Sequence, residues 1–376
     1  MKIVIYINSL TCGGAERVSV ALANFLAEQG HELVVITMHL EERDFYKVDA
    51  SVRRVSLNLV GVHSGLGKLI ANYRRWHALR CVLKLEKPDI VVAMMTTSIV
   101  LATLAAIGLP VRVYGSERNF PGRKATGWAC SLLRRLVYRF ADAHIAQTRE
   151  SAVWLEQHTR AKNIHVIPNP VVWPIPSTKP HVEPEAVISS ARKLILAVGT
   201  KVDQKGFDLL VQAFAGLTVE RAEWDLVILG IDPNSSKTYG GGASIKVLAD
   251  ELGIADRVYL LGRVGNVADW YTRAEIFALS SRYEGFPNVL IEALASGCAS
   301  IAFDCDTGPR DIIQDGVNGC LVQPENIDEF RSGLAKLMED DSLREKFSKN
   351  GVMVRDTFSE EKIMGLWAKA IGLAKV

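Results

Sequence analysis

The stretch from Ser280 to Gly297 carries residue types that could hold a phosphate and a sugar at one spot. It follows the apolar run 276–279, which is typical of a buried strand. Gly285 permits a tight turn, Pro287 suits the first turn of a helix, and Gly297 fits the helix end. Strand, glycine turn and helix in this order direct free backbone N–H groups at one point, which suits an anion such as a diphosphate.

Two glutamates frame this turn, Glu284 in the loop and Glu292 inside the helix. A carboxylate repels a phosphate, so these side chains are better placed to accept hydrogen bonds from hydroxyl groups of a ribose or a sugar. A solvated loop glutamate beside a capping glutamate is the alternative interpretation of the same two residues.

Two lysines, Lys201 and Lys205, flank a loop that follows the apolar run 194–198. Ligands of open α/β sheets bind at the carboxyl edge of the strands, where this loop would lie. A lysine there can neutralise a leaving diphosphate without a metal ion. Asp304 and Asp306 have the Asp-x-Asp spacing of a metal site, but their neighbours suit a loop, so the sequence favours neither a metal nor another cofactor.

Other glycine turns could also contact a ligand, although an ordinary turn or surface loop fits each of them about as well. The turn near the N-terminus lacks the dinucleotide-binding fingerprint and the P-loop pattern. The pair at 263–264 could present its backbone to a nucleobase. These segments are 8–17 with Gly13 and Gly14, 262–264 with Arg263 and Val264, 306–311, and 115–119 with Glu117 and Arg118.

The composition is that of a soluble globular protein of 376 residues, a length typical of two domains. Its net charge of +2 hides an asymmetry, because residues 1–180 carry a balance of +10 and residues 181–376 a balance of −8. A basic half indicates an anionic partner such as nucleic acid, a membrane surface or a phosphorylated substrate. Attraction between the two halves is the alternative explanation.

Much of the basic charge falls on two expected helices, 68–86 and 126–140, each of which also carries apolar residues. A helix of this kind can lie at an anionic membrane or bind diphosphates, although a solvated basic face is the usual explanation. The cations are Lys68, Arg74, Arg75, Arg80 and Lys84 on or beside the first helix, and Arg123, Lys124, Arg134, Arg135 and Arg139 on or beside the second.

No segment predicts export or a membrane span. The six cysteines lack metal-ligand spacing and suit a reducing cytosol. The first residues are too β-rich for a signal sequence. The uncharged run 90–111 is split by polar residues, glycine and proline, so we expect a strand (90–94), a helix (98–107) and a strand (111–114) rather than a transmembrane helix.

Short β-rich runs alternate with helical segments in both halves of the chain, which predicts two doubly wound parallel sheets. Five prolines between residues 167 and 180 mark a stiff, extended connection between them. We therefore expect a first domain at 1–175, a second at 190–355 and closing helices to residue 376.

These motifs together resemble the retaining glycosyltransferases of family 4, which have the GT-B fold. The resemblance runs through Gly-Gly-Ala-Glu near the N-terminus, V-G-x-x-x-x-x-K-G at 198–206, G-R-V at 262–264 and the stretch 280–297. Its most specific part is the pair of glutamates eight residues apart. Within the family the chain looks most similar to bacterial PglH-type enzymes that extend polyprenyl-diphosphate-linked oligosaccharides.

The resemblance implies two Rossmann-like domains facing each other across a cleft, with segment 356–376 returning to the N-terminal, acceptor-binding domain. Backbone N–H groups at Gly14 would contact the donor diphosphate, Lys205 would stabilise it as it leaves, Glu292 would hold the ribose and Glu284 the donor sugar. The residues expected to bind the donor are Gly13, Gly14, Thr200, Arg263, Val264, Gly285, Phe286, Pro287, Asn288, Val289 and Glu292. The residues expected to be catalytic are Lys205, Glu284, Lys201 and Arg118. The residues expected to contact the acceptor or the membrane are Lys68, Arg74, Arg75, Arg80, Lys84 and Glu117.

Two positions depart from the family pattern. Thr200 stands where an arginine is usual, so Lys201 would have to supply the second positive charge. A common histidine of the first domain is replaced, with Arg118 near its place.

The resulting hypothesis is a metal-independent, retaining glycosyltransferase that uses a nucleotide sugar, expected to be UDP-linked, and a lipid-linked or cell-surface glycan acceptor. It would lie at the cytoplasmic face of the plasma membrane and bind no nucleic acid. A nucleotide-sugar epimerase or hydrolase of the same fold is one alternative. A non-catalytic basic protein that binds membrane or nucleic acid is another.

Overall fold

The computed structural model describes residues 1–11, 13–61, 65–123, 127–233 and 244–373, with Gly65 and Leu66 described by their backbone alone. The chain divides into two compact units. Unit 1 is Met1–Pro170 with Glu360–Val376, and unit 2 is Val171–Ser359. Cys12, one of the six cysteines, and Lys124 lie outside the described residues. Cys81, Cys298, Cys305 and Cys320 are free thiols.

Unit 1 contains a parallel sheet whose strands are β1 (Lys2–Tyr6), β2 (Glu32–Thr37), β3 (Arg53–Ser56), β4 (Ile90–Met94), β5 (Arg112–Ser116), β6 (Ala143–Ala146) and β7 (Ile164–Val166). Over the described residues the strand order is β3-β2-β1-β4-β5-β6-β7. Strand β3 escapes prediction because its sequence, Arg-Arg-Val-Ser, has no apolar run. Its position is set by pairing with β2 instead.

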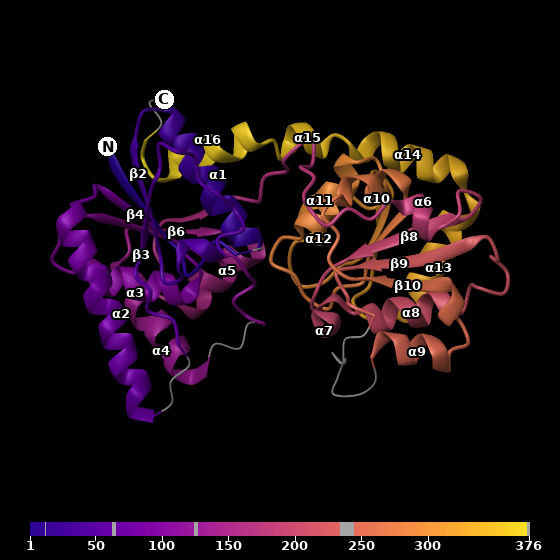
Figure 1. Ribbon diagram of the computed structural model, residues 1–376, viewed down its shortest axis with the longest axis horizontal. Coiled ribbons are helices and arrows are strands. Elements are labelled where there is room, and N and C mark those ends of the chain that lie inside the picture. The colour runs from indigo at the N-terminus through magenta and orange to yellow at the C-terminus, as the bar shows by residue number, and fades with distance from the viewer. Residues whose placement is uncertain (12, 62–64, 124–126, 234–243, 374–376) are drawn as a thin grey trace. The chain divides into compact units, whose positions relative to one another are not determined.

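Helices cover both faces of this sheet, as the doubly wound prediction requires (Figure 1). On β1, Val4 and Tyr6 face α2 and α3, and the alternate residues Ile3 and Ile5 are buried on the other side, where α1 and α16 pack together. The helices are α1 (Gly14–Glu28), α2 (Gly65–Glu86), α3 (Thr96–Ala106), α4 (Gly127–Val137), α5 (Arg149–His158) and α16 (Glu360–Ala370), with short turns η1 (Glu41–Arg43) and η2 (Tyr138–Phe140).

Unit 2 repeats the architecture with strands β8 (Lys193–Val198), β9 (Trp224–Leu229), β10 (Val258–Leu261), β11 (Ile276–Leu279), β12 (Ala299–Phe303) and β13 (Cys320–Val322). Its described strands are parallel and run in the order β10-β9-β8-β11-β12-β13. Helix α8 (Phe207–Ala215) packs on α9 (Ile245–Glu251) and α13 (Ile327–Glu339) over one large apolar core.

The remaining helical segments of unit 2 are short or peripheral. Helices α10 (Val267–Arg273) and α11 (Asn288–Ala295) lie across the sheet from α8 and α9 (Figure 1). The others are α6 (Pro184–Val187), α7 (Val202–Lys205), α12 (Pro309–Ile312), α14 (Asp341–Gly351), α15 (Val354–Thr357) and η3 (Ala255–Arg257). Two doubly wound domains are therefore confirmed.

The proline-rich connection is extended, as its composition predicts, but much of it is tied to unit 2. Val171 N–H donates to Phe358 O at 2.8 Å, and Thr178 N–H donates to Gly265 O at 2.9 Å. A Cβ on Gly265 would lie 1.9 Å from Thr178 O, so only glycine permits this approach. The segment after Pro170 therefore behaves as part of unit 2 rather than as a free linker.

The uncharged run 90–111 folds as strand β4, helix α3 and the approach to β5, as the sequence predicts. In the part of the chain that the structure describes, no helix is long and apolar enough to span a bilayer.

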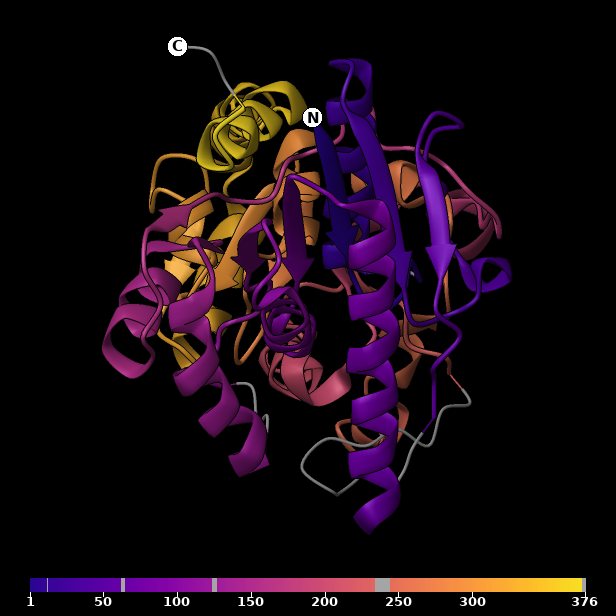
Figure 2. The same cartoon turned by 90° about the vertical axis from the view of Figure 1, so that its left-hand side faces the viewer.

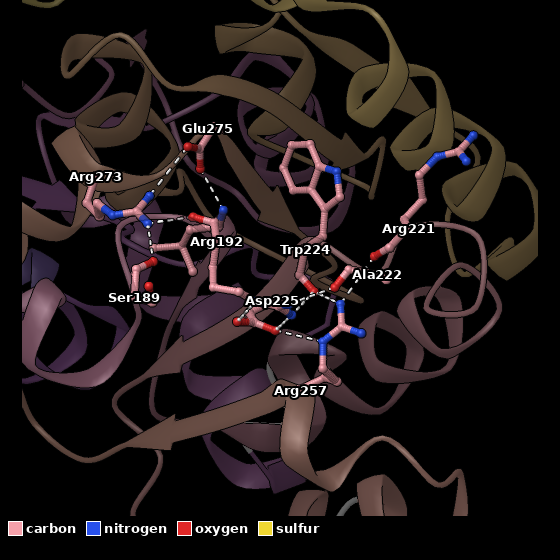
Figure 3. A network of polar contacts seen from close by, with 10 residues as sticks. Ser189, Arg192, Arg221, Ala222, Trp224, Asp225, Arg257, Arg273 and Glu275 are labelled. Atoms are coloured by element: carbon pink, nitrogen blue, oxygen red, sulfur yellow. Dashed lines mark hydrogen bonds and ion pairs between the residues drawn. The ribbon is translucent and has the colours of Figure 1, made fainter.

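A buried ionic network braces the sheet of unit 2 at the amino ends of its strands (Figure 3). Asp225, the second residue of β9, is almost fully buried and accepts hydrogen bonds from Arg192 and Arg257. Arg257 also donates to the backbone carbonyls of Arg221 and Trp224. This network lies at the opposite end of the strands from the carboxyl edge, so we assign it to stability.

Each sheet has one point where the strand order reverses, between β1 and β4 in unit 1 and between β8 and β11 in unit 2. Ligands of open α/β sheets bind at the carboxyl edge beside such a point. The loop with Lys205 follows β8 and the loop with Glu284 follows β11. In unit 1, Gly13 and Gly14 follow β1 after a short loop. The residues singled out by sequence thus flank both reversal points.

Candidate active site

The central contact of the candidate site joins Lys205 and Glu284. Lys205 Nζ lies 2.7 Å from Glu284 Oε1, and Ser281 Oγ donates to the same oxygen at 2.6 Å. Both charged side chains are largely shielded from solvent, with exposed fractions of 15% and 8%. Both residues were predicted from the sequence, but their contact was not, because 79 positions separate them in the chain. The adjacency of β8 and β11 brings them together.

Backbone and side-chain hydrogen bonds fix the lysine loop against the loop after β11. Arg282 N–H donates to Gln204 O at 2.9 Å, and Ser280 Oγ donates to Lys205 O at 2.8 Å. Gly206 has a left-handed φ of +57°, and a Cβ there would lie 2.1 Å from Ser280 O. Glycine is required at this position. The Lys205 backbone is thereby held in one place before any ligand binds.

Arg282 also holds the glutamate loop in place, although the sequence interpretation did not assign this residue to the site. Its guanidinium pairs with the buried carboxylate of Asp208 through contacts of 2.8 and 2.6 Å, and its Nη1 donates to Asp203 O at 2.7 Å. The hydrogen bonds to Asp208 raise the pKa of Arg282. The pair fixes the first turn of α8 to the glutamate loop. Its only sequence signal was the position of Arg282 two residues before Glu284.

Two glycine turns of unit 2 pack directly against each other. Thr307 Oγ1 donates to the backbone carbonyl of Glu284 at 2.6 Å. Gly308 has φ +98°, and a Cβ there would lie 2.6 Å from Pro287 Cδ and 3.2 Å from Gly285 O. The segment 306–311 is therefore part of the support for the first glycine turn, rather than a separate surface loop.

The second glutamate of the motif, Glu292, lies on α11, is largely buried and accepts a hydrogen bond from Tyr271 Oη at 3.2 Å. The helix around it matches the expectation closely, since α11 begins directly after Pro287 and Gly297 has a φ of +83° just beyond its end. Tyr271, on α10, was not singled out by sequence.

The other expected donor-binding residues of unit 2 have varied environments. Thr200, Lys201 and Arg263 are exposed, at or near the carboxyl ends of β8 and β10, so their polar groups are accessible. Gly285, Phe286 and Pro287 are buried, whereas Val264, Asn288 and Val289 are half-buried.

In unit 1, helix α1 begins at Gly14 with Gly13 as its N-cap. A Cβ on Gly13 would lie 2.4 Å from a carboxylate oxygen of Glu16, so Glu16 folds back over the helix start. A carboxylate at this position stabilises the N-terminus of a helix. It also competes for the place where the sequence predicts a diphosphate.

Glu117, expected on the acceptor side, is buried at the carboxyl end of β5. Thr96 Oγ1 donates to Glu117 Oε2 at 2.8 Å, and Tyr138 Oη donates to Oε1 at 2.5 Å. Burial raises the pKa of Tyr138 well above its ordinary value.

Next to Thr96, Met95 has a φ of +77°, a strained conformation for a non-glycine residue, and its N–H donates to Ser116 O at 2.8 Å. Such strain is typical of functional sites.

Arg118 is buried as well, with its guanidinium against the ring of Trp367 on α16 at 5.9 Å. It donates to Asn169 Oδ1, which also accepts from Gln147 Nε2 at 2.9 Å. Among the described residues, its Nε and Nη1 have no hydrogen-bond partner. Burial lowers the pKa of Arg118 to about 9. This environment favours a positioning role, and the predicted catalytic role stays a prediction.

The cations expected on α2 fall into two groups. Lys68, Arg74 and Lys84 are exposed. Arg75 donates to the backbone carbonyls of Leu59 and Gly61, and Arg80 donates to those of Ala105 and Ile107 at the end of α3. The side chains of Arg75 and Arg80 therefore cap carbonyl groups of the neighbouring backbone.

Within the described ranges no cluster of three or more His, Cys, Asp or Glu side chains has the arrangement of a metal site.

Two family models together match most of the chain. Residues 12–172 match the family described as Glycosyltransferase Family 4, and residues 180–352 match Glycosyl transferases group 1. The two matches fall on the two units on either side of the proline-rich segment.

Two relatives cover nearly the whole chain. A Campylobacter jejuni protein named GalNAc-alpha-(1->4)-GalNAc-alpha-(1->3)-diNAcBac-PP-undecaprenol alpha-1,4-N-acetyl-D-galactosaminyltransferase is 29% identical, over 100% of this chain and 99% of its own. The amylovoran biosynthesis glycosyltransferase AmsD of Erwinia amylovora is 24% identical over 97% and 98%.

A solved structure, HepE of Anabaena in complex with UDP-glucose, superposes with a TM-score of 0.79 at 18% identity over all of both chains. This likeness shows the fold.

Proposed function

Because this chain belongs to the family 4 glycosyltransferases and has the GT-B fold, we propose that it is a retaining, metal-independent enzyme. It transfers a hexose or N-acetylhexosamine from a UDP-sugar to a polyprenyl-diphosphate-linked or cell-surface glycan acceptor. The observation that carries this proposal is the Lys205–Glu284 contact at the reversal point of the unit 2 sheet, beside the N-terminus of α11.

Lys205 is the proposed electrophilic group. Negative charge develops on the donor diphosphate as the glycosidic bond breaks, and a fixed ammonium group lowers the energy of that state. Glu284 holds Nζ in position through the 2.7 Å contact and offers its other carboxylate oxygen to hydroxyl groups of the donor sugar. Exposed Lys201 adds positive charge where the family usually has arginine, at Thr200.

The remaining contacts with the donor are proposed from where the residues lie in the fold. Glu292 binds the ribose hydroxyls, and Arg263 and Val264 border the base. The backbone N–H groups of Gly285, Phe286, Asn288 and Val289 face the diphosphate. In unit 1, Gly13 and Gly14 supply further N–H groups once the Glu16 carboxylate moves aside.

The chemistry proposed for the reaction needs no protein nucleophile. The acceptor hydroxyl attacks the anomeric carbon on the face that the diphosphate leaves, so the configuration is retained. The hydroxyl proton passes to the departing phosphate oxygen, and the new bond forms as the old one breaks. The products are the extended acceptor and UDP.

The relatives support the choice of substrates. The Campylobacter relative is named for an undecaprenyl-diphosphate-linked acceptor, and HepE was solved with UDP-glucose. We further propose that the protein acts at the cytoplasmic face of the plasma membrane. The exposed cations Lys68, Arg74 and Lys84 would lie toward it, and Glu117 and Arg118 would shape the acceptor side.

The proposal is tested with a panel of radiolabelled UDP-sugars, each incubated with and without polyprenyl-diphosphate-linked oligosaccharide and with and without EDTA. We expect transfer that needs the acceptor, persists in EDTA and gives an α-linked product from an α-linked donor. Conversion of the UDP-sugar without acceptor would instead identify an epimerase or a hydrolase.

A further inference from the structure

Helix α4 presents its apolar residues outward. Its buried residues are Arg134 and Val137, and the Arg134 guanidinium lies over the ring of Trp154 at 4.5 Å. The exposed residues include four large apolar side chains, Trp128, Leu132, Leu133 and Leu136, followed by Phe140 in η2. Trp128 is 82% exposed. A water-soluble helix normally has the reverse arrangement, with the arginine outside and the leucines inside.

The exposed half of α2 adds to this surface. Its residues Leu69, Ile70 and Tyr73 are each more than half exposed. Helix α3 packs against both α2 and α4, and the N-terminal parts of these two helices extend past α3 on the same side of unit 1 (Figure 1 and Figure 2). Two apolar helix ends therefore project in one direction.

The charge on α4, and on α2 before its last residue Glu86, has one sign. From Gly65 to Leu85, and from Arg118 to Ala141, the sequence contains no aspartate or glutamate. The exposed cations beside the apolar residues are Lys68, Arg74, Arg135 and Arg139. Leucine and tryptophan flanked by arginine and lysine is the composition of helices that enter the interface of an anionic bilayer.

We infer that α4 and the exposed half of α2 form the surface on which the protein docks to a bilayer containing anionic phospholipid. Trp128, Leu132 and Leu136, spaced four residues apart, enter the headgroup region together. Arg135 and Arg139 lie beside them and contact phosphate groups. An acidic protein would account for the cations, but it would leave the projecting apolar helix ends without a nonpolar partner.

This inference extends the proposed function, since a lipid-linked acceptor lies in the bilayer that α4 would enter. It assigns membrane binding mainly to the leucines and tryptophan of α4, rather than to the cations of α2 that the sequence predicts. Arg75 and Arg80 take no part, because their guanidinium groups cap backbone carbonyls.

The test is sedimentation of the full chain with vesicles of equal parts phosphatidylcholine and phosphatidylglycerol, and with vesicles of phosphatidylcholine alone. We expect the protein to prefer the mixed vesicles and to release as salt is raised. The double variant Trp128→Glu with Leu132→Glu should lose more than about tenfold of its partitioning, through lost apolar burial and added repulsion. Val219→Glu, at a 93% exposed apolar residue of unit 2, should bind like the unchanged protein.

Equal binding by the double variant, or no binding to mixed vesicles by the unchanged protein, would overturn the inference. Sedimentation velocity without lipid supplies a second check, because a dimer that the double variant abolishes would assign the surface to another copy of this chain.

Sugar transfer in detergent to a short-chain, water-soluble acceptor separates this inference from the proposed function. We expect equal rates for the double variant and the unchanged protein, because neither substitution touches the site of unit 2. Absence of transfer by both, with vesicle binding intact, would refute the function and leave the docking surface standing.

Discussion

Lys205 Nζ and Glu284 Oε1 lie 2.7 Å apart although 79 positions separate the two residues in the chain. The contact has a defined cause, because β8 and β11 are neighbours at the point where the strand order of unit 2 reverses. The loops after both strands therefore share one edge. Gly206, whose Cβ would lie 2.1 Å from Ser280 O, allows them to approach.

Replacement of this lysine tests the proposed chemistry. Lys205→Ala should lower kcat by about 10²-fold or more, the loss typical of one charge-stabilising group. Thermal unfolding should confirm that the variant folds. Lys349→Ala, at an exposed lysine paired with Glu345, provides the control and should keep the full rate. A Lys205→Ala enzyme with near-normal turnover would remove this residue from the mechanism.

Gly308 offers a test of the contact between the two glycine turns. Its φ is +98° and an added Cβ would lie 2.6 Å from Pro287, so Gly308→Ala should displace the turn at 285–287. We expect UDP affinity, measured by calorimetry, to fall by about tenfold or more, equivalent to about 1.4 kcal/mol. Gly316→Ala is the matched control, since Gly316 also has a positive φ, +69°, but meets nothing within 4 Å. If both variants bind UDP alike, the crowding at Gly308 has no role in donor binding.

The neighbouring arginines Arg74 and Arg75 should behave differently. Arg75 donates to Leu59 O at 2.9 Å and to Gly61 O at 3.0 Å, whereas Arg74 is exposed. Arg75→Ala should lower the free energy of unfolding by about 1–2 kcal/mol through the lost hydrogen bonds. Arg74→Ala should leave it unchanged and weaken binding to anionic vesicles instead. Urea unfolding of both variants decides the first point, and equal stabilities would contradict it.

Local patterns made much of the fold and of unit 2 predictable. The turn at Gly285, the start of α11 after Pro287 and its end near Gly297 all follow from residue preferences within a few positions. Alternation of strands and helices predicts both doubly wound sheets. Strand β3 was missed because pairing with β2, and not its own sequence, makes it a strand.

Features that depend on tertiary packing could not be predicted. The basic and apolar residues of α4 are plain in the sequence, yet periodicity alone does not show which face points inward. Trp154, on α5, settles this by stacking against Arg134. In the same way, only the structure shows that Arg75 and Arg80 cap carbonyls and that Arg118 lies under Trp367.

Asp225 provides a test of stability away from the site. It is buried and accepts hydrogen bonds from Arg192 and Arg257, as Figure 3 shows. Asp225→Asn would leave two guanidinium groups without their carboxylate, so the free energy of unfolding should fall by about 3 kcal/mol. Asp328→Asn, which breaks an exposed pair with Arg331, should cost little.

UDP affinity at low temperature should be the same for both of these variants. A large loss of UDP binding in folded Asp225→Asn protein would contradict the assignment of the network to stability.

His144 provides a test by pH. It is fully buried on β6 and stacked on Tyr138, whose hydroxyl donates to Glu117, and burial lowers the pKa of His144 to about 4. The unfolded chain binds this proton near pH 6.5 and the folded chain only near pH 4. Stability from the neutral imidazole is therefore complete above pH 6.5 and is lost as the pH falls toward 4, by up to about 3 kcal/mol.

His144→Phe keeps an aromatic ring against Tyr138 and removes the titrating group. Urea unfolding between pH 7 and pH 4 should therefore show a smaller loss of stability for this variant than for the unchanged protein. His165→Phe, on the neighbouring strand β7 and exposed, is the control and should keep the original slope. Identical slopes for all three proteins would show that His144 is not held neutral by its burial.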